Sequence, residues 1–394
     1  MSTPDVVIIG GARTPFTRIN SKLAGQTAVE LGATAIRGAL GRAGVSADDI
    51  DAVIMGQVLQ AGAGQNPAKQ AAVAAGIPWR VPATTLNKVC LSGLAAITDA
   101  ARLIRLGEAS VVVAGGQESM TNAPHVLPGS RRGFTYGATS MLDSAAHDGL
   151  TDAFDHDSMG ASTERFNGRY GLTRTEQDEI AAESHRRAGA AQSGGVFDDE
   201  IVPVEVPQRK GDPVVVDTDE GVRPDSTVEV LAKLRPAFAA EGSITAGNSS
   251  PLSDGAAAVV VASREWAEER GLPWLALVGV AGQVAGPDNS LHSQPANAIA
   301  AALEKTGDSA ADLDLVEINE AFAAVSLQSM RELGIEPDVV NVHGGAIALG
   351  HPIGASGARL ALHAALELSR RGSGRAAVAL CGGGGQGEAL LLSR

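Results

Sequence analysis

Aromatic residues, cysteines and long hydrophobic runs are all scarce in this chain of 394 residues. Only 3% of the residues are aromatic, and the two cysteines are Cys90 and Cys381. So few cysteines in so long a chain argue against a disulfide framework, and we expect a cytoplasmic protein. No run reaches the roughly 20 apolar residues of a membrane-spanning helix. Residues 1–5 lack the basic start of a signal peptide, so we expect no membrane association.

Clusters of basic residues are also missing. The formal net charge is −14, and no more than two Lys or Arg residues are adjacent. Such a surface should repel a phosphate backbone, so we expect no nucleic-acid partner. No group of His and Cys residues has the spacing of a metal site, and we therefore expect no metal.

What the chain does contain is an alternation of strand and helix patterns. We expect strands at 6–9, 51–56 and 111–114, the first ended by two glycines, and helices at 28–43 and 92–106. This alternation is typical of an α/β fold with a mainly parallel sheet covered by helices.

The sequence also repeats itself at an offset of about 263 residues. Residues 33–40 match 296–303, 44–53 match 307–316, and Cys90-Leu91-Ser92-Gly93 lies opposite 354–357. A repeat this long predicts duplicated α/β domains, with a site at their seam. We expect one half at 1–120 plus 249–272 and the other at 273–394. An inserted loop domain, 121–248, should contain one clear helix, 175–192, and a strand at 201–206.

Two residues carry the pattern of a nucleophile and a base. Cys90 directly precedes a predicted helix, whose N-terminus would stabilise a thiolate; the alternative is an inert buried cysteine. His351 lies between Gly350 and Pro352, which we expect to begin a helix. Its pKa suits a general base, although a turn histidine bonded to backbone is the alternative.

Cys381 and Asn319 each follow a predicted strand. Cys381 ends the strand 376–380 and precedes four glycines, where strand ends and open backbone N–H groups favour ligand binding. The match of 382–387 to G-x-G-x-x-G is rejected, because a strand rather than a helix should follow it. Asn319 follows the strand 315–318, where its amide could hold a water or polarise a carbonyl. The alternative is a helix N-cap, and the two roles do not exclude each other.

Taken together, these motifs resemble the thiolase family, in particular its acetyl-CoA C-acetyltransferases. The resemblance extends over nearly the whole chain and includes residues 10–16, 62–70, the Cys90 loop, 113–120, 234–238, 245–256, 319–323, 344–352 and the Cys381 loop. It implies two thiolase-like halves in a layered α-β-α-β-α arrangement, with the inserted loop domain binding coenzyme A.

The resemblance implies a role for each candidate catalytic residue. Cys90 would be the nucleophile and acyl carrier, and His351 would take its proton. Cys381 would act as acid and base on the second acetyl-CoA and on the leaving thiol. A water held by Asn319 would form one oxyanion hole with His351, and the N–H groups of Cys90 and Gly383 would form the other.

The implied reaction is the reversible Claisen condensation of two acetyl-CoA to acetoacetyl-CoA and CoA, by an acyltransferase of fatty acid metabolism. Coenzyme A is substrate and product, and no separate cofactor is expected. Family members are homodimers or homotetramers. The positions that match the family's CoA and acyl path are Leu150, Met159, Arg223, Ala237, Phe238, Ala246, Ser250, Ala321 and Phe322.

Three positions depart from the pattern of many relatives: Ser158, Pro251 and His343. We expect them to affect the acyl chain length of the substrate and the affinity for CoA, and not the catalytic chemistry. A degradative 3-ketoacyl-CoA thiolase therefore remains an alternative. A ketoacyl synthase would have His or Asn in place of Cys381. A non-catalytic CoA-binding protein would turn nothing over.

Overall fold

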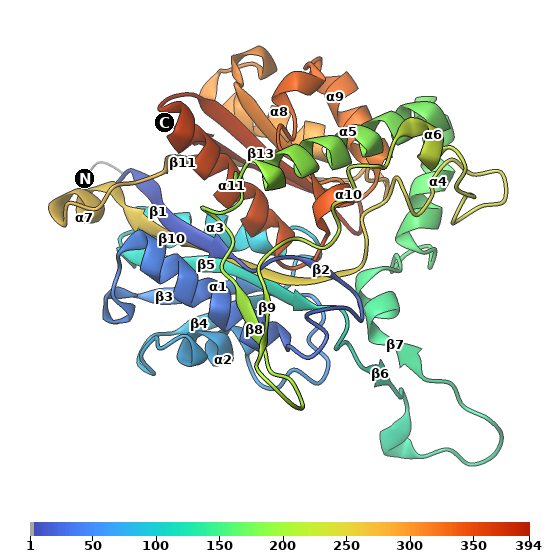
Figure 1. The fold of residues 1–394 in the computed structure, drawn as a ribbon, viewed down its shortest axis with the longest axis horizontal. Coiled ribbons are helices and arrows are strands. Elements are labelled where there is room, and N and C mark those ends of the chain that lie inside the picture. Colours follow the sequence, from blue (N-terminus) through green and yellow to red (C-terminus); the bar gives the residue numbers. More distant parts are fainter. Residues whose placement is uncertain (1–3) are drawn as a thin grey trace.

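The computed structural model describes residues 4–394, and they form two α/β halves around a shared sheet (Figure 1). The strands of the N-terminal half are β1 (Val6–Arg13), β2 (Thr17–Arg18), β3 (Ala52–Gly56), β4 (Ala83–Leu86), β5 (Val111–Ser119) and β10 (Ser253–Ser263). Those of the C-terminal half are β11 (Ala276–Ala285), β12 (Leu315–Ile318), β13 (Arg375–Gly382) and β14 (Gln386–Ser393).

Hydrogen bonds join these strands into one ten-stranded sheet in the order β12-β13-β14-β11-β1-β10-β5-β3-β4, with β2 paired to β10. The two halves meet where β1 pairs with β11, at Val7 opposite Leu277 and Ile8 opposite Ala276. The pairs β3–β4, β3–β5 and β12–β13 are parallel, whereas the central pairs are antiparallel. The sheet is therefore mixed, less parallel than the sequence predicts.

Helices cover both outer faces and fill the centre, which confirms the expected five layers. The helices α3 (Ser92–Arg105) and α11 (Ser356–Arg371) pack against each other in one apolar core between the two halves. On the outside, α1 (Ala28–Ala43) and α2 (Pro67–Ala74) cover the N-terminal half. In the same way α8 (Gln294–Thr306) and α9 (Ala323–Leu333) cover the C-terminal half.

The internal repeat is visible in the structure. Strand β3 lies between β4 and β5, and β12 lies between β13 and a bridge from Val316 to Val340. Helices α1 and α8, and helices α3 and α11, occupy equivalent places in the two halves. The duplication read from the sequence is therefore a duplication of fold, although the exact domain limits stay a prediction.

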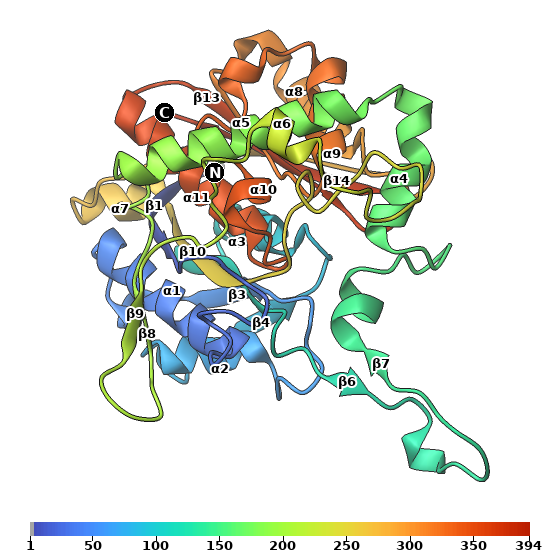
Figure 2. The ribbon, with the colours of Figure 1, turned by 45° about the vertical axis from the view of Figure 1, so that its right-hand side comes forward.

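Residues 121–248 interrupt the repeat with more structure than the sequence predicts. The elements are β6 (His125–Val126), β7 (Leu142–Asp143), α4 (Met159–Tyr170), α5 (Arg174–Ser193), β8 (Val204–Val206), β9 (Val214–Val216) and α6 (Val228–Leu231). The β6–β7 segment extends away from the body as an arm, and α5 lies across the C-terminal half (Figures 1 and 2). Two short helices remain, α7 (Arg264–Glu269) and α10 (Ala346–Leu349).

The predicted end of the first strand is wrong. Strand β1 continues through Gly10 and Gly11 instead of ending there. A Cβ on Gly10 would lie 2.7 Å from Ala43 of α1, and one on Gly11 would lie 2.6 Å from Leu362 of α11. These glycines are therefore strand residues that let helices approach closely on both faces, and not chain breakers.

Helix α11 also begins later than predicted. Residues 352–355 form a turn in which the N–H groups of Ala355 and Ser356 both donate to the Pro352 carbonyl, so α11 begins at Ser356. Helix α9 begins at Ala323 with Phe322 as its N-cap, so Asn319 is not a helix cap.

Candidate active site

Cys90 lies on a tight, strained turn at the start of α3. Its neighbour Val89 has φ = 52°, a conformation that a β-branched residue rarely adopts. Ser92 holds the turn closed, because its hydroxyl donates to the Val89 carbonyl (2.6 Å) and accepts the Lys88 N–H (2.8 Å). The surroundings therefore fix a backbone geometry that presents the Cys90 thiol, as predicted, just before the helix N-terminus.

His351 lies on the equivalent turn before α11. Its Nδ1 is 2.6 Å from the Ser356 hydroxyl, which itself donates to the Pro352 carbonyl (3.1 Å). Since that hydroxyl has one proton and donates it, Ser356 must accept from Nδ1–H. The other ring nitrogen, Nε2, then carries a lone pair, which accepts the Asn319 amide at 3.3 Å. The expected base is thus held in the tautomer that can take a proton at Nε2.

The environment of His351 keeps its imidazole neutral. Burial and, to a smaller extent, the charge of Arg359 lower the pKa of His351 to about 4. Near neutral pH the ring is therefore free to accept a proton, in agreement with the role expected of it.

Burial has the opposite effect on the two thiols. Burial and, to a smaller extent, the Glu118 carboxylate raise the pKa of Cys90 to about 12. The backbone N–H groups of Cys90 itself and of Gly383 oppose this rise, because they can bond to the sulfur. Burial and the neighbouring Cys90 also raise the pKa of Cys381. Both thiols rest as neutral acids, so Cys90 needs a base to become a nucleophile.

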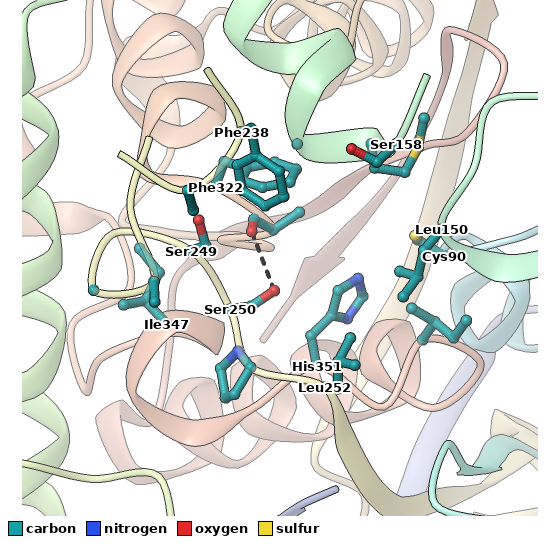
Figure 3. Close-up of a pocket in the computed structure, with 18 of the residues that line it drawn as sticks. Cys90, Leu150, Ser158, Phe238, Ser249, Ser250, Leu252, Phe322, Ile347 and His351 are labelled. Atoms are coloured by element: carbon teal, nitrogen blue, oxygen red, sulfur yellow. Dashed lines mark hydrogen bonds between the residues drawn. The ribbon is translucent and has the colours of Figure 1, made fainter. Parts of the chain in front are cut away.

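One cavity of about 860 Å³ brings the predicted residues together, and its walls include Cys90, His351, Cys381 and Gly383. Figure 3 shows Cys90 and the His351 ring facing it from different segments. Asn319 is fully buried but is not on the cavity wall; it lies behind His351 and contacts its ring. The structure thus places it next to the predicted base and not directly on the path of a substrate.

All nine residues predicted to bind CoA line this cavity: Leu150, Met159, Arg223, Ala237, Phe238, Ala246, Ser250, Ala321 and Phe322. Phe238 and Phe322 meet edge to face, with ring centroids 6.2 Å apart. The Ser250 hydroxyl donates to the Ala321 carbonyl at 3.1 Å, which leaves its oxygen free to accept a ligand N–H (Figure 3). Aromatic walls with a few polar groups suit a long, partly apolar ligand.

The three departures fall in different places. Ser158 and Pro251 line the cavity, so they can affect which substrate fits. His343 lies elsewhere, with its Nδ1 3.0 Å from Nε2 of the buried His363.

Sequence reasoning missed several groups at this site. His185 lines the cavity and accepts the Arg223 N–H at 3.2 Å, so it is not merely a structural histidine. Ser356 positions His351, and the internal repeat contained a signal for it, since it aligns with Ser92. Glu118, on β5, raises the pKa of Cys90 through its charge, an effect that no sequence pattern reveals.

Within residues 4–394, no group of three or more His, Cys, Asp or Glu side chains could hold a metal ion. Within the same residues, no helix is long and apolar enough to cross a membrane.

Comparison with known proteins agrees with this geometry. Residues 6–265 match the family model for the thiolase N-terminal domain, and residues 272–394 match that for the thiolase C-terminal domain. A probable acetyl-CoA acetyltransferase of Mycolicibacterium smegmatis is 59% identical, covering 98% of this chain and 100% of the relative. The acetyl-CoA acetyltransferase of Pseudomonas aeruginosa is 53% identical, with 99% of each chain covered.

A solved structure gives the same result for the fold. The crystal structure of the Bacillus anthracis acetyl-CoA acetyltransferase matches with a TM-score of 0.97 at 41% identity, and the match covers 100% of this chain and 99% of that one. The turns that carry Cys90 and His351 thus belong to a frame shared over the full length of these proteins, and the chain is a member of the thiolase family.

Proposed function

We propose that this chain is an acetyl-CoA C-acetyltransferase, which condenses two acetyl-CoA to acetoacetyl-CoA and CoA and also runs the reaction in reverse. The observation that carries the proposal is that Cys90, His351 and Cys381 line one cavity. The names of the full-length relatives support the choice of acetyl groups.

In the first half-reaction, the Cys90 thiol loses its proton to Nε2 of His351 and attacks the thioester carbonyl. The tetrahedral oxyanion collapses, Cys381 donates its proton to the leaving CoA thiolate, and acetyl-Cys90 and the Cys381 thiolate remain. In the second, the Cys381 thiolate removes the α-proton of another acetyl-CoA, and the resulting enolate attacks the acetyl group. This releases the Cys90 thiolate, which takes back its proton from His351. Splitting one condensation in two in this way lowers each barrier.

We assign the oxyanion sites by the same logic. The backbone N–H groups of Cys90 and Gly383 lower the pKa of the Cys90 thiol, so they are near enough to donate to an oxygen bound beside the sulfur. Asn319 and His351 would serve the other carbonyl, with Asn319 acting through a water. Two thiols and one imidazole supply every proton transfer required, and we propose that no cofactor beyond the CoA substrate takes part.

A degradative thiolase of broader chain length is the second candidate. It is favoured by Ser158, a small residue on the cavity wall that leaves more room than a ring would. Assembly as a homodimer or homotetramer, a cytoplasmic location and a role in fatty acid metabolism remain predictions. The exposed edge strand β4, close to the Cys90 turn, is the surface that we propose for a dimer contact.

The test is thiolysis of 3-ketoacyl-CoA esters of increasing chain length, with Cys90→Ala as the control. Activity confined to acetoacetyl-CoA and lost in the variant supports the proposal. Equal activity on long chains shifts the assignment to the degradative enzyme. No turnover of any ester by the wild type would leave only a CoA-binding protein.

A further inference from the structure

Glu118, on β5, is a completely buried carboxyl group that no step above uses. Its carboxylate accepts three backbone N–H groups, from Val58 (3.0 Å), Leu59 (3.1 Å) and Gly354 (2.9 Å). One oxygen, Oε2, receives both Val58 and Gly354. A single atom of Glu118 therefore joins a segment that follows β3 to the turn that carries His351.

The two segments that Glu118 joins belong to the two reacting groups. Val58 and Leu59 pack with Met120 and Ile353 in an apolar cluster that Cys90 contacts. Gly354 lies three residues after His351 in the same turn. Glu118 therefore lies between the Val58–Leu59 segment, which packs beside Cys90, and the turn that carries His351.

The fit around this junction leaves almost no freedom. The Gly354 carbonyl packs against Gly56, Gly93 and Gly116, where an added Cβ would lie 2.8, 2.9 and 1.9 Å from that oxygen. Gly93 is in the first turn of α3, just after Cys90. Packing fixes the distance between the Cys90 turn and the His351 turn, but it does not fix their relative orientation. The hydrogen bonds of Glu118 are directional and therefore fix that orientation.

The charge of Glu118 also reaches the thiol. Burial and, to a smaller extent, Asp254 on the neighbouring β10 raise the pKa of Glu118 to about 7, against the effect of its three N–H donors. Glu118 in turn raises the pKa of Cys90. Asp254 and Cys90 are thus the titratable groups whose charges interact with that of Glu118.

We infer that Glu118 is a positioning residue for the transfer of the Cys90 proton to His351, and that it holds the two turns in register through its hydrogen bonds to Val58, Leu59 and Gly354. This inference rests on the proposed function for its effect on turnover. Its effect on the chemistry of the thiol is independent of that function.

Two variants separate position from charge. Glu118→Gln keeps the size of the side chain but removes the charge and turns an NH2 group toward backbone donors. Glu118→Asp keeps the charge but is one methylene too short to reach both segments. We expect kcat for acetoacetyl-CoA thiolysis to fall roughly 10- to 100-fold in both variants, with KM within about twofold, because misplacing reacting groups by about 1 Å has effects of this size.

The second readout is the pH dependence of alkylation of Cys90 by iodoacetamide in a Cys381→Ala background. A neighbouring negative charge disfavours a thiolate, so Glu118→Gln should move the alkylation profile to lower pH. Glu118→Asp should leave it nearly in place. A general loss of stability would not shift the alkylation profile of Glu118→Gln while leaving that of Glu118→Asp in place.

Asp51→Asn is the matched control. Asp51 also uses one carboxylate oxygen, Oδ2, to accept two backbone N–H groups, from Ser110 (2.7 Å) and Val111 (3.0 Å). It precedes β3, at the opposite end of that strand from the segment that Glu118 binds. It should leave kcat and the alkylation profile unchanged. Equal losses in Asp51→Asn and Glu118→Gln would reduce Glu118 to a general stabiliser and overturn the inference.

An unchanged kcat in Glu118→Gln would overturn it as well. If Glu118→Gln fails to fold, Glu118→Asp decides: a folded variant with wild-type kcat contradicts the inference, and one with lowered kcat and unchanged KM supports it. A wild-type chain without thiolysis activity would instead reject the proposed function, and the alkylation profiles would still test Glu118.

Discussion

The turns before α3 and α11 occupy equivalent places in the two halves, but they present different reactive groups. In each, a serine in the first turn fixes the residues before the helix: Ser92 bonds to Val89 and Lys88, and Ser356 bonds to Pro352 and His351. The difference is the reactive group that each turn presents, a thiol in the first half and an imidazole in the second. The duplication supplied the frame, and divergence of a few residues placed a nucleophile beside a base.

Removing the thiol should break this comparison most completely. Cys90→Ala leaves the frame of α3 intact but removes the only group proposed to carry the acyl chain, so we expect thiolysis to fall by roughly 10³-fold or more. Initial rates with acetoacetyl-CoA measure this, with the thermal unfolding midpoint as the control for folding. Activity within tenfold of the wild type would mean that the two turns are not a nucleophile and base pair.

Removing the imidazole should have the next largest effect. His351→Asn takes away the acceptor at Nε2 while keeping a polar side chain, and a positioned base typically contributes about 10²–10⁴-fold. We expect a loss of this size in kcat, measured as above. Raising the pH should recover part of the rate, because hydroxide can then ionise Cys90 without help; no recovery at all would argue against a role as base.

The two serines test the comparison directly. Ser356→Ala leaves Nδ1 of His351 without its partner and frees the ring to adopt the wrong tautomer, so we expect kcat to fall about tenfold with KM unchanged. Ser92→Ala should instead loosen the strained turn and slow the alkylation of Cys90. If each variant affected both readouts equally, the two turns would not have separate functions.

The smallest expected effect is in the pH profile. Because burial lowers the pKa of His351 to about 4, the ring stays neutral when the pH falls below the ordinary value near 6.5. In the Glu118→Gln variant, which lacks the carboxyl group whose pKa burial raises to about 7, kcat/KM reports the free enzyme without that ionisation. It should therefore stay within about twofold from pH 8 down to about 5.5. An acid limb centred near pH 6.5 in this variant would show that the ring titrates normally and that its burial has no consequence.

Much of this site follows from the sequence because its motifs are local. Cys90, His351 and Cys381 each stand at a turn marked by Gly, Pro or a strand end, and the repeat revealed the two halves. Asn319 was located correctly, but its alternative role as a helix cap was wrong, because the chain turns through Phe322 before α9 begins.

What the sequence hides depends on contacts between distant segments. Glu118 and Gly354 are 236 positions apart, and nothing in either local pattern indicates their bond. The late start of α11 has the same origin, since residues 352–355 are held in a turn by packing against three glycines from other elements. Gly10 and Gly11 were read as a chain break because a glycine that ends a strand and one that receives a helix look alike in sequence.

The most direct test of the pairing of the two turns is to trap the acyl-enzyme. Wild-type protein, Cys90→Ala and Cys381→Ala would each be incubated briefly with acetyl-CoA, quenched with acid, and analysed by mass spectrometry of the intact chain and its peptides. We predict one acetyl group on the peptide that contains Cys90, present in the wild type and in Cys381→Ala and absent from Cys90→Ala. Acetylation of Cys381, or a label that survives in Cys90→Ala, would contradict the account.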